Sequence, residues 1–310
     1  MYKRLTKQKT GDILKKMPGF NCTGGRADAI RRTTYKEAIS KPPSQEFSDM
    51  ANIKRPAPEV INALAELGTD AVTSTMDSLG VHRTFIEGPI ARVPGSKIVG
   101  PALTLRFVPQ REDQMKGYQI PGAAPADAAI EGEEAGEKRS ALWEIFDYVQ
   151  AGDVIVVDGR SDLATGCFGE MLMTYFQAQG GVGVVIDAGI RDSAQIFNDL
   201  KVPVWSTAVT TGGAGHMNLF PADINLPIAC GKVLVNPGDI IMADDGGAIV
   251  VPPLLIPRIL EIAGEREEHE VFARLKLRQG GALNKYYPFN DEGRKEYEEW
   301  LAIQKKGRKT

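Results

Sequence analysis

The chain has 310 residues, of which 43% are apolar and 25% are charged, so it can bury a substantial core as one large domain or two smaller ones. Its formal net charge of −3 gives no general reason to expect a nucleic-acid or membrane partner, and no apolar stretch reaches the length of a membrane span. Three scattered cysteines are too few for a disulfide framework, and the basic first residues lack the apolar run of a signal peptide, so we expect a cytoplasmic protein.

The first third of the chain combines turn-rich segments with short periodic patterns. Residues 1–55 are polar and basic, and we interpret them as an N-terminal extension. Apolar spacing predicts helices over 58–67 and 69–80, followed by an extended segment over 91–108. Residues 109–140 are rich in Gly, Ala and Glu and are interpreted as an insertion. Two Gly-Pro pairs in the extended segment predict turns: Pro94–Gly95 and Gly100–Pro101.

The middle of the chain carries the most regular pattern. A helix over 142–150 leads into two apolar runs, Val154–Val157 and Val182–Ile186, which predict strands. An amphipathic helix that starts near Phe168 lies between the two strands. The pattern then predicts a tight turn, a helix and a strand: Ala188–Gly189, 193–200 and 202–206.

The last third begins with short strands and ends in helix. Residues 227–251 hold closely spaced apolar runs separated by Gly and Pro-Gly, which predict a strand-rich region, and 254–278 predict a long charged helix. We interpret 281–310 as a C-terminal tail. Strand-helix-strand order followed by short strands predicts an α/β fold with parallel and antiparallel portions, in one catalytic domain over 56–280.

Three residues at the ends of predicted elements could carry chemistry. Glu170 opens a helix, and Arg191 and Asp192 follow a strand, where α/β folds assemble their sites. The planar guanidinium of Arg191 suits an anionic substrate, and the carboxylate of Asp192 suits a hard divalent cation. The N–H groups of Met171 and Leu172 lie in the first helical turn, where they lack intrahelical partners and favour anions.

With these residues the chain resembles the metal-dependent pyruvate aldolases that cleave 4-hydroxy-4-methyl-2-oxoglutarate and 4-carboxy-4-hydroxy-2-oxoadipate. The regulator of ribonuclease E activity shares their fold, which is called RraA-like. The resemblance rests on the spacing of twenty residues between Glu170 and the Arg191–Asp192 pair. It extends to flanking blocks on both sides of that spacing: Thr75–Leu79, Gly88–Ile90, 97–109, Pro237–Asp239 and Ile240–Pro252.

The resemblance implies a layered β/β/α swivelling-type domain and a class II pyruvate aldolase, a carbon-carbon lyase acting on a 2-oxo acid. It implies a Mg²⁺ or Mn²⁺ ion that Asp192 binds directly and Glu170 binds through a water. Arg191 and the helix N-terminus from Gly169 onward would bind the substrate. Oxaloacetate decarboxylation could follow at the same site, because both reactions pass through pyruvate enolate.

Relatives of this kind are homotrimers or homohexamers with sites at subunit interfaces. In such an assembly a carboxylate of a neighbouring subunit, Glu267 or Glu270, could reach the metal. The chain departs mildly from the family pattern: Phe168 stands where a Trp often precedes Gly-Glu. The extension and the insertion leave the exact substrate open.

Simpler interpretations of the same residues stay open. An Arg-Asp pair after a strand can be a turn ion pair or a helix cap, and Glu170 can be a favourable first-turn charge. Asp158 and Asp187 are interpreted as turn formers, as are Asp244 and Asp245 before two glycines.

Other chemistry-bearing residues give weaker signals. Cys167 is interpreted as a buried small residue, and His216 in a Gly-rich loop is the histidine we would test for substrate contact. Lys201 and Lys232 adjoin polar or turn residues, which disfavours a Schiff-base aldolase.

Two alternative functions stay open. One is a metal-dependent sugar-acid lyase, dehydratase or isomerase, and the other is a non-catalytic binding protein of the ribonuclease-regulator type. Retention of Glu170, Arg191 and Asp192 together favours catalysis.

Overall fold

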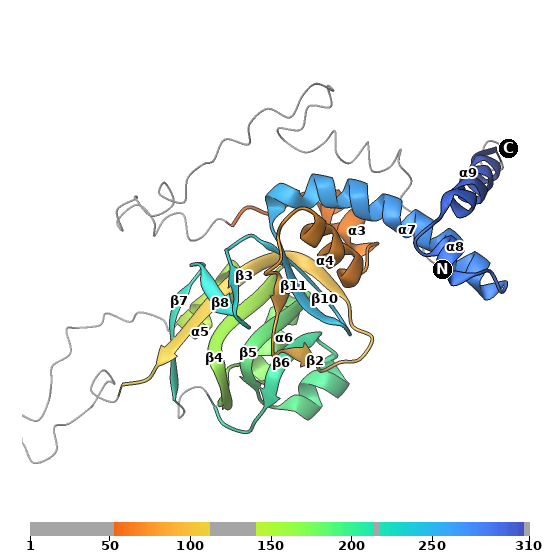
Figure 1. Ribbon diagram of the computed structural model, residues 1–310. Helices are drawn as coiled ribbons and strands as arrows, with labels where there is room; N and C mark the ends of the chain where they lie inside the picture. The colour runs from red at the N-terminus through yellow and green to blue at the C-terminus, as the bar shows by residue number, and fades with distance from the viewer. Residues whose placement is uncertain (1–52, 112–140, 214–217, 307–310) are drawn as a thin grey trace, which may run out of the picture.

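The computed structural model describes residues 53–111, 141–213 and 218–306. Within these ranges, one mixed sheet carries a small separate hairpin and a set of helices (Figure 1). Strands neighbour one another in the order β1-β11-β10-β3-β4-β5-β6-β2, and β7 also pairs with β3. The strands are Phe85–Ile86 (β1), Ile90–Ala91 (β2), Ile98–Pro109 (β3), Val154–Gly166 (β4), Gly183–Ile190 (β5), Val204–Val209 (β6), Leu219–Ile224 (β7), Ile228–Cys230 (β8), Val233–Val235 (β9), Ile240–Asp244 (β10) and Gly247–Val251 (β11).

Strands β3, β4, β5 and β6 run parallel, and the remaining sheet pairings are antiparallel. The predicted mixture of parallel and antiparallel strands is therefore confirmed. Val154–Val157 and all of β5 are buried, as expected for parallel strands covered on both faces. The β10–β11 hairpin turns between Asp244 and Gly247, where the two aspartates predicted it.

Different layers cover the two faces of the parallel strands. Residues of the 3₁₀ turn η2 (Ile145–Tyr148) and of α6 (Glu170–Ala178) pack on one face, and the β8–β9 hairpin packs on the other. This is the β/β/α layering that the resemblance implied. Helices α3 (Pro58–Ala65), α4 (Thr69–Ser78) and α7 (Ile256–Arg278) cover the antiparallel part, with α7 passing over α3 and α4 (Figure 1). These three helices match the predicted segments.

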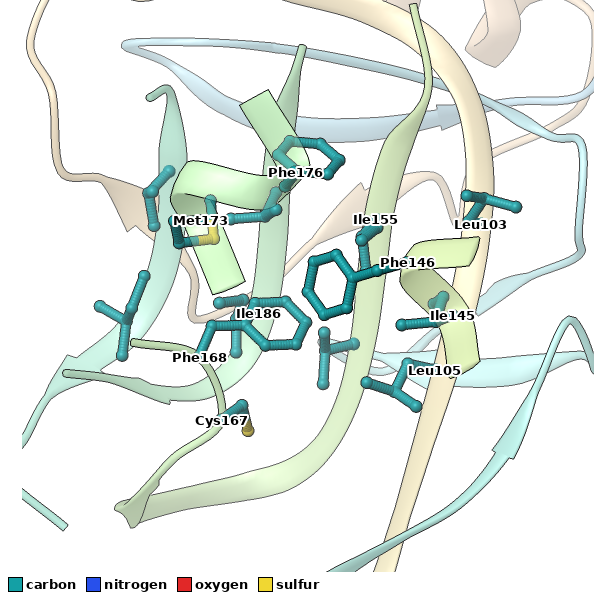
Figure 2. Packing of buried hydrophobic residues seen from close by; sticks show 14 of the residues in the cluster. Leu103, Leu105, Ile145, Phe146, Ile155, Cys167, Phe168, Met173, Phe176 and Ile186 are labelled. Atoms are coloured by element: carbon teal, nitrogen blue, oxygen red, sulfur yellow. The ribbon is translucent and has the colours of Figure 1, made fainter. Parts of the chain in front are cut away.

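An aromatic cluster lies beneath α6 and includes Phe168, two residues before the helix begins. Figure 2 shows Phe168 and Phe146 facing each other between α6 and the strands; their ring centroids are 5.5 Å apart in an edge-to-face arrangement. Both rings are buried. Phe168 therefore anchors the segment that leads into α6.

We expect Phe168→Ala to lower the free energy of unfolding by about 3–5 kcal/mol, because it removes a fully buried ring and leaves a cavity. Tyr175→Ala is the matched control: Tyr175 also contacts Phe146 edge-on, at 6.4 Å, but it is 46% exposed. Urea unfolding of both variants measures the difference. Equal losses would contradict this account of the core.

Two glycine-containing pairs that predicted turns lie inside strands. Gly100–Pro101 belongs to β3 and Ala188–Gly189 belongs to β5, so both turn predictions were wrong. A Cβ at Gly100 would lie 2.1 Å from the carbonyl oxygen of Gly152, and one at Gly189 would lie 2.8 Å from that of Thr165. These glycines allow another backbone segment to approach a strand closely, and a local sequence pattern does not distinguish that role from a turn.

Several element boundaries also differ from the prediction. Strand β4 continues to Gly166 through irregular pairing, and β6 covers Val204–Val209 rather than 202–206. The predicted helix over 142–150 is a short α-turn, α5 (Ala141–Glu144), followed by η2. The helix predicted over 193–200 is present, with a π-helical turn over Gln195–Leu200.

The predicted tail folds as helix instead. Helices α8 (Leu283–Tyr286) and α9 (Asp291–Lys306) pack on the outer half of α7, away from the sheet (Figure 1). A second aromatic cluster holds these helices together, with Phe272 of α7 buried at its centre. Lys276 and Lys285 both form ion pairs with Glu296. This packing depends on contacts with α7, so the sequence of the tail alone did not reveal it. Strands β1, β2 and β7 were also not predicted.

Residues 1–52 and 112–140 lie outside the described ranges, so the extension and the insertion stay predictions, as do the domain boundaries. In the described part of the chain, no helix is both long and apolar enough to cross a bilayer.

Candidate active site

Arg191 lies where β5 ends, beside the chain segment that leads into α6. Its N–H donates to the carbonyl oxygen of Phe168 at 3.0 Å, and the N–H of Cys167 donates to the carbonyl oxygen of Gly189 at 2.9 Å. The end of β5 and the segment before α6 therefore run side by side. Helix α6 begins at Glu170, as predicted. Glu170 and Arg191, which are separated by twenty residues in the sequence, therefore lie on neighbouring segments in the fold.

Asp192 joins the two segments through its side chain. Its Oδ2 accepts a hydrogen bond from the N–H of Glu170 at 3.0 Å, and it lies 3.7 Å from Nε of Arg191. Asp192 also has a positive φ of 55°, an uncommon conformation for a residue other than glycine. The helix-cap and ion-pair interpretations are both correct as geometry. The carboxylate of Asp192 is nevertheless half-exposed, so it can still bind a ligand.

Three glycines surround the side chain of Arg191. A Cβ at Gly169 would lie 2.5 Å from Oδ2 of Asp192 and 2.7 Å from Nε of Arg191. A Cβ at Gly213 would lie 3.1 Å from Nη1 of Arg191, and one at Gly166 would lie 3.1 Å from its Cβ. A larger residue at Gly169 or Gly213 would therefore crowd the guanidinium, and one at Gly166 would crowd the Cβ of Arg191 and the carbonyl oxygen of Gly212. Gly166 and Gly213 were not predicted as site residues.

The site combines positive groups with an opening to solvent. The side chains of Arg191 and Asp192 are 46% and 43% exposed, and Glu170 is half-buried. The N–H of Glu170 donates to Asp192. The N–H groups of Met171 and Leu172 follow in the first turn of α6, where backbone donors lack intrahelical partners. A guanidinium and helix N–H groups on one side can hold an anionic substrate.

The donor set fits a hard divalent cation. In the described ranges, no group of three or more His, Cys, Asp or Glu side chains lies within reach of one ion. Mg²⁺ and Mn²⁺ suit such a site, because Mg²⁺-type ions keep several waters and often use one or two carboxylates. Asp192, whose Oδ2 accepts the bond from the backbone N–H of Glu170, and Glu170 itself are the residues that would hold such a cation.

Asp158 and Asp187 lie within β4 and β5, on the face covered by the β8–β9 hairpin. Asp187 is buried in the strand and accepts hydrogen bonds from Ser161 Oγ at 3.0 Å and from the N–H of Gly231 at 3.3 Å, so its interpretation as a turn former was wrong. Asp158 accepts a bond from the N–H of Arg160 at 3.2 Å, as a turn former does. Burial raises the pKa of Asp158, and the charge of Asp187 adds to this shift.

The surroundings of Cys167 and Lys232 disfavour a role for either side chain as a nucleophile. Cys167 is buried, and burial raises the pKa of its thiol well above the usual range, so it is no nucleophile near neutral pH. Lys232 pairs with Glu87, which raises the pKa of its amine, whereas a Schiff-base lysine needs a lowered one. Lys201 is exposed. His216 lies outside the described residues.

A cavity of about 500 Å³ lies away from Arg191, between α7, α8 and α9. Its walls include Glu270, which pairs with Arg266 at 3.5 Å. Glu267, one helical turn away, is half-buried, and burial raises the pKa of its carboxyl group. No residue of the Arg191 site lines this cavity, so the two features are separate.

Comparison with known proteins identifies the family and agrees with the fold. The model of one protein family, described as Aldolase/RraA, matches residues 59–250. The chain belongs to the Aldolase/RraA family. The match includes Glu170, Arg191 and Asp192, and excludes α7, α8 and α9.

Relatives in the family are similar only in part. Protein DlpA of Legionella pneumophila is 24% identical over 80% of this chain and 36% of its own length. A protein of Halalkalibacterium halodurans, named as a candidate 4-hydroxy-4-methyl-2-oxoglutarate aldolase, is 28% identical over 43% of this chain and 61% of its own length. The chain thus spans about a third and about three fifths of these relatives.

Among solved structures, Streptomyces coelicolor RraAS2 has a TM-score of 0.62 and 36% identity, covering 72% of this chain and 99% of its own. It is described as an unusual member of the RNase ES inhibitor RraA protein family. An uncharacterised protein from Pseudomonas syringae has a TM-score of 0.60 and 22% identity, covering 75% of this chain and 98% of its own. Both support the RraA-like fold.

Proposed function

We propose that the protein is a divalent-metal-dependent lyase that cleaves a 4-hydroxy-2-oxo dicarboxylate into pyruvate and a second oxo acid. The observation that carries this proposal is the contact of Arg191 and Asp192 with the N-terminus of α6 at Glu170. Family membership supports it, because a relative in this family is named as a candidate aldolase of that type.

In this proposal each residue has a separate task. Arg191 binds the carboxylate of the substrate through its planar fork, and the N–H groups of Met171 and Leu172 add donors. Asp192 and Glu170 would hold Mg²⁺ or Mn²⁺, which supplies positive charge where the keto oxygen becomes negative. Through a bound water, the carboxylate of Glu170 accepts the proton of the 4-hydroxyl group. The C3–C4 bond then breaks, its electron pair forms pyruvate enolate, and C4 becomes the carbonyl carbon of the second product. The proton returns from Glu170 to C3 of the enolate, which gives pyruvate.

Metal removal tests the proposal directly. We expect dialysis against EDTA to lower the rate of pyruvate release at least about 10²-fold, because the enolate charge loses its main stabilising partner. Added Mg²⁺ or Mn²⁺ should restore the rate. Lactate dehydrogenase with NADH reports the pyruvate, and authentic pyruvate added to each sample controls for the coupling enzyme. A rate unchanged by EDTA would contradict the metal-dependent route.

A substrate panel separates the related enzyme functions. 4-Hydroxy-4-methyl-2-oxoglutarate, 4-carboxy-4-hydroxy-2-oxoadipate and oxaloacetate all lead to pyruvate enolate, whereas sugar acids of the aldonic type, which lack a 2-oxo group, do not. Turnover of the first group supports the aldolase. Turnover of sugar acids alone would replace it with the metal-dependent sugar-acid lyase, dehydratase or isomerase.

A second candidate function is favoured by the likeness to RraAS2, which is 36% identical over nearly its whole length and is described as a member of an RNase inhibitor family. In that case the chain would bind a ribonuclease and need no metal. Arg191→Ala separates the two functions. The substitution removes the guanidinium that would bind the substrate of a lyase, so lyase activity should be lost. Inhibition of a ribonuclease through another surface would persist.

We also propose a homotrimer or homohexamer, in which a neighbouring subunit brings Glu267 or Glu270 toward the metal. Light scattering of the full chain tests this proposal. A monomeric mass would contradict it.

A further inference from the structure

The pairing of strand β4 with β5 is irregular at two places in the second half of β4, the half that leads to the candidate site. Its pairing with β5 shifts once between Val157 and Asp162, and again between Asp162 and Gly166. From Val157 to Gly166, β4 takes nine residue steps, whereas β5 takes three between the paired Ile186 and Gly189. Six residues of β4 are therefore extruded from the ladder, at the carboxyl ends of the parallel strands where α/β folds place ligands.

Asp162 holds the second extrusion together. Its Oδ1 accepts hydrogen bonds from the N–H groups of Ala164 at 2.7 Å and Thr165 at 3.3 Å. Its Oδ2 accepts from Thr165 Oγ1 and from Asn218 Nδ2, both at 3.3 Å. Asn218 directly precedes β7, so this one carboxylate joins two segments that are 56 residues apart.

The extruded part of β4 forms hydrogen bonds with the segment that leads to Gly213. Thr210 Oγ1 donates to the carbonyl oxygen of Ala164 at 3.2 Å, and the N–H of Gly166 donates to the carbonyl oxygen of Gly212 at 2.8 Å. Gly213 follows at once and lies against the guanidinium of Arg191. The position of one wall of the site therefore depends on the shape of the extrusion.

We propose that Asp162 is a positioning residue for Arg191. Asp162 shapes the extruded part of β4, and through Ala164, Gly166 and Gly212 it keeps Gly213 against the guanidinium. This inference rests on the proposed function, because Arg191 is taken as the substrate-binding cation. Asp162 itself need touch neither substrate nor metal.

Asp162→Asn tests the inference with little change in shape. The amide oxygen can still accept from Ala164, but the amide nitrogen replaces an acceptor for Asn218 with a second donor. We expect kcat/KM for pyruvate release to fall about 10–100-fold, since small displacements of a binding group have effects of that size. The dissociation constant of oxalate, a stable mimic of pyruvate enolate, should rise by a similar factor.

Two further variants sharpen the test. In Asp162→Asn/Asn218→Asp the donor and acceptor change places, and we expect the double variant to recover most of the lost activity. Asp239→Asn is the matched control: Asp239 accepts from the N–H of Asn236 at 2.8 Å in the turn before β10. Asp239→Asn should lower Tm without changing kcat/KM or oxalate binding at temperatures well below Tm.

The side-chain Nε–Hε resonance of Arg191, assigned by its loss in Arg191→Lys, gives a readout that needs no activity. It should shift in Asp162→Asn, return in the double variant and stay unchanged in Asp239→Asn. An unshifted resonance with unchanged oxalate binding overturns the inference, and so does a double variant that behaves like Asp162→Asn. If the wild-type protein releases no pyruvate, the lyase proposal fails, while this resonance still decides the role of Asp162.

Discussion

Asp192→Ala is expected to lower kcat for metal-dependent pyruvate release by about 10³-fold or more, equivalent to about 4 kcal/mol of transition-state stabilisation. The substitution removes the carboxylate that would bind the cation. It also removes the acceptor for the N–H of Glu170, so α6 loses a cap bond as well. Steady-state kinetics with saturating Mg²⁺ and thermal unfolding of the same samples measure both effects.

Asp192→Asn separates the two roles. Its amide oxygen can still accept the bond from Glu170, but the negative charge is gone, so stability should change by less than about 1 kcal/mol while activity is still lost. Asp199→Asn, an exposed carboxylate in the π-helical turn, is the control and should change neither. Full activity of Asp192→Asn would mean that Asp192 is only a helix cap.

Gly169→Ala is expected to lower kcat/KM by about 10²-fold with little loss of stability. The φ of Gly169 is −123°, which alanine adopts readily, so backbone strain does not explain the effect. The new Cβ would lie 2.5 Å from Oδ2 of Asp192 and 2.7 Å from Nε of Arg191. Because those distances are too short for real Cβ contacts, both side chains must move away from their present positions.

Gly264→Ala provides the control for this prediction. Gly264 lies inside α7, and among the described residues no atom outside its own helix backbone lies within 4 Å of its Cβ position, so alanine should raise stability by about 0.5–1 kcal/mol and leave kinetics unchanged. Gly213→Ala, with a longer contact of 3.1 Å to Arg191 Nη1, should show a smaller loss than Gly169→Ala. If Gly169→Ala were as active as wild type, the present placement of the guanidinium would not matter for turnover.

Much of the candidate site was predictable from local pattern. The apolar runs around Val154 and Val184 predicted two neighbouring parallel strands, and the amphipathic segment predicted a helix that begins at Glu170. Because the carboxyl ends of such strands meet at one edge, Glu170 and Arg191 had to lie near each other. The chemistry of these side chains then predicted an anion and a hard cation.

The glycines show where local pattern fails. Gly100 and Gly189 were assigned to turns, since a glycine beside proline or after an apolar run is most often a turn signal. In the structure each one permits a close approach by a backbone segment that is distant in sequence. Asp162 was likewise indistinguishable from any loop aspartate, because its partner Asn218 lies 56 residues further along the chain.

The sequence by itself determined which chemical groups the site contains, and that one guanidinium and two carboxylates stand at the ends of neighbouring elements. Side-chain type and spacing along the chain carry that information. Only the tertiary structure decided how Arg191 is held, because Gly213 and the extruded part of β4 reach it through space. Such approaches depend on register and bulges across the whole sheet, which no short window of residues records.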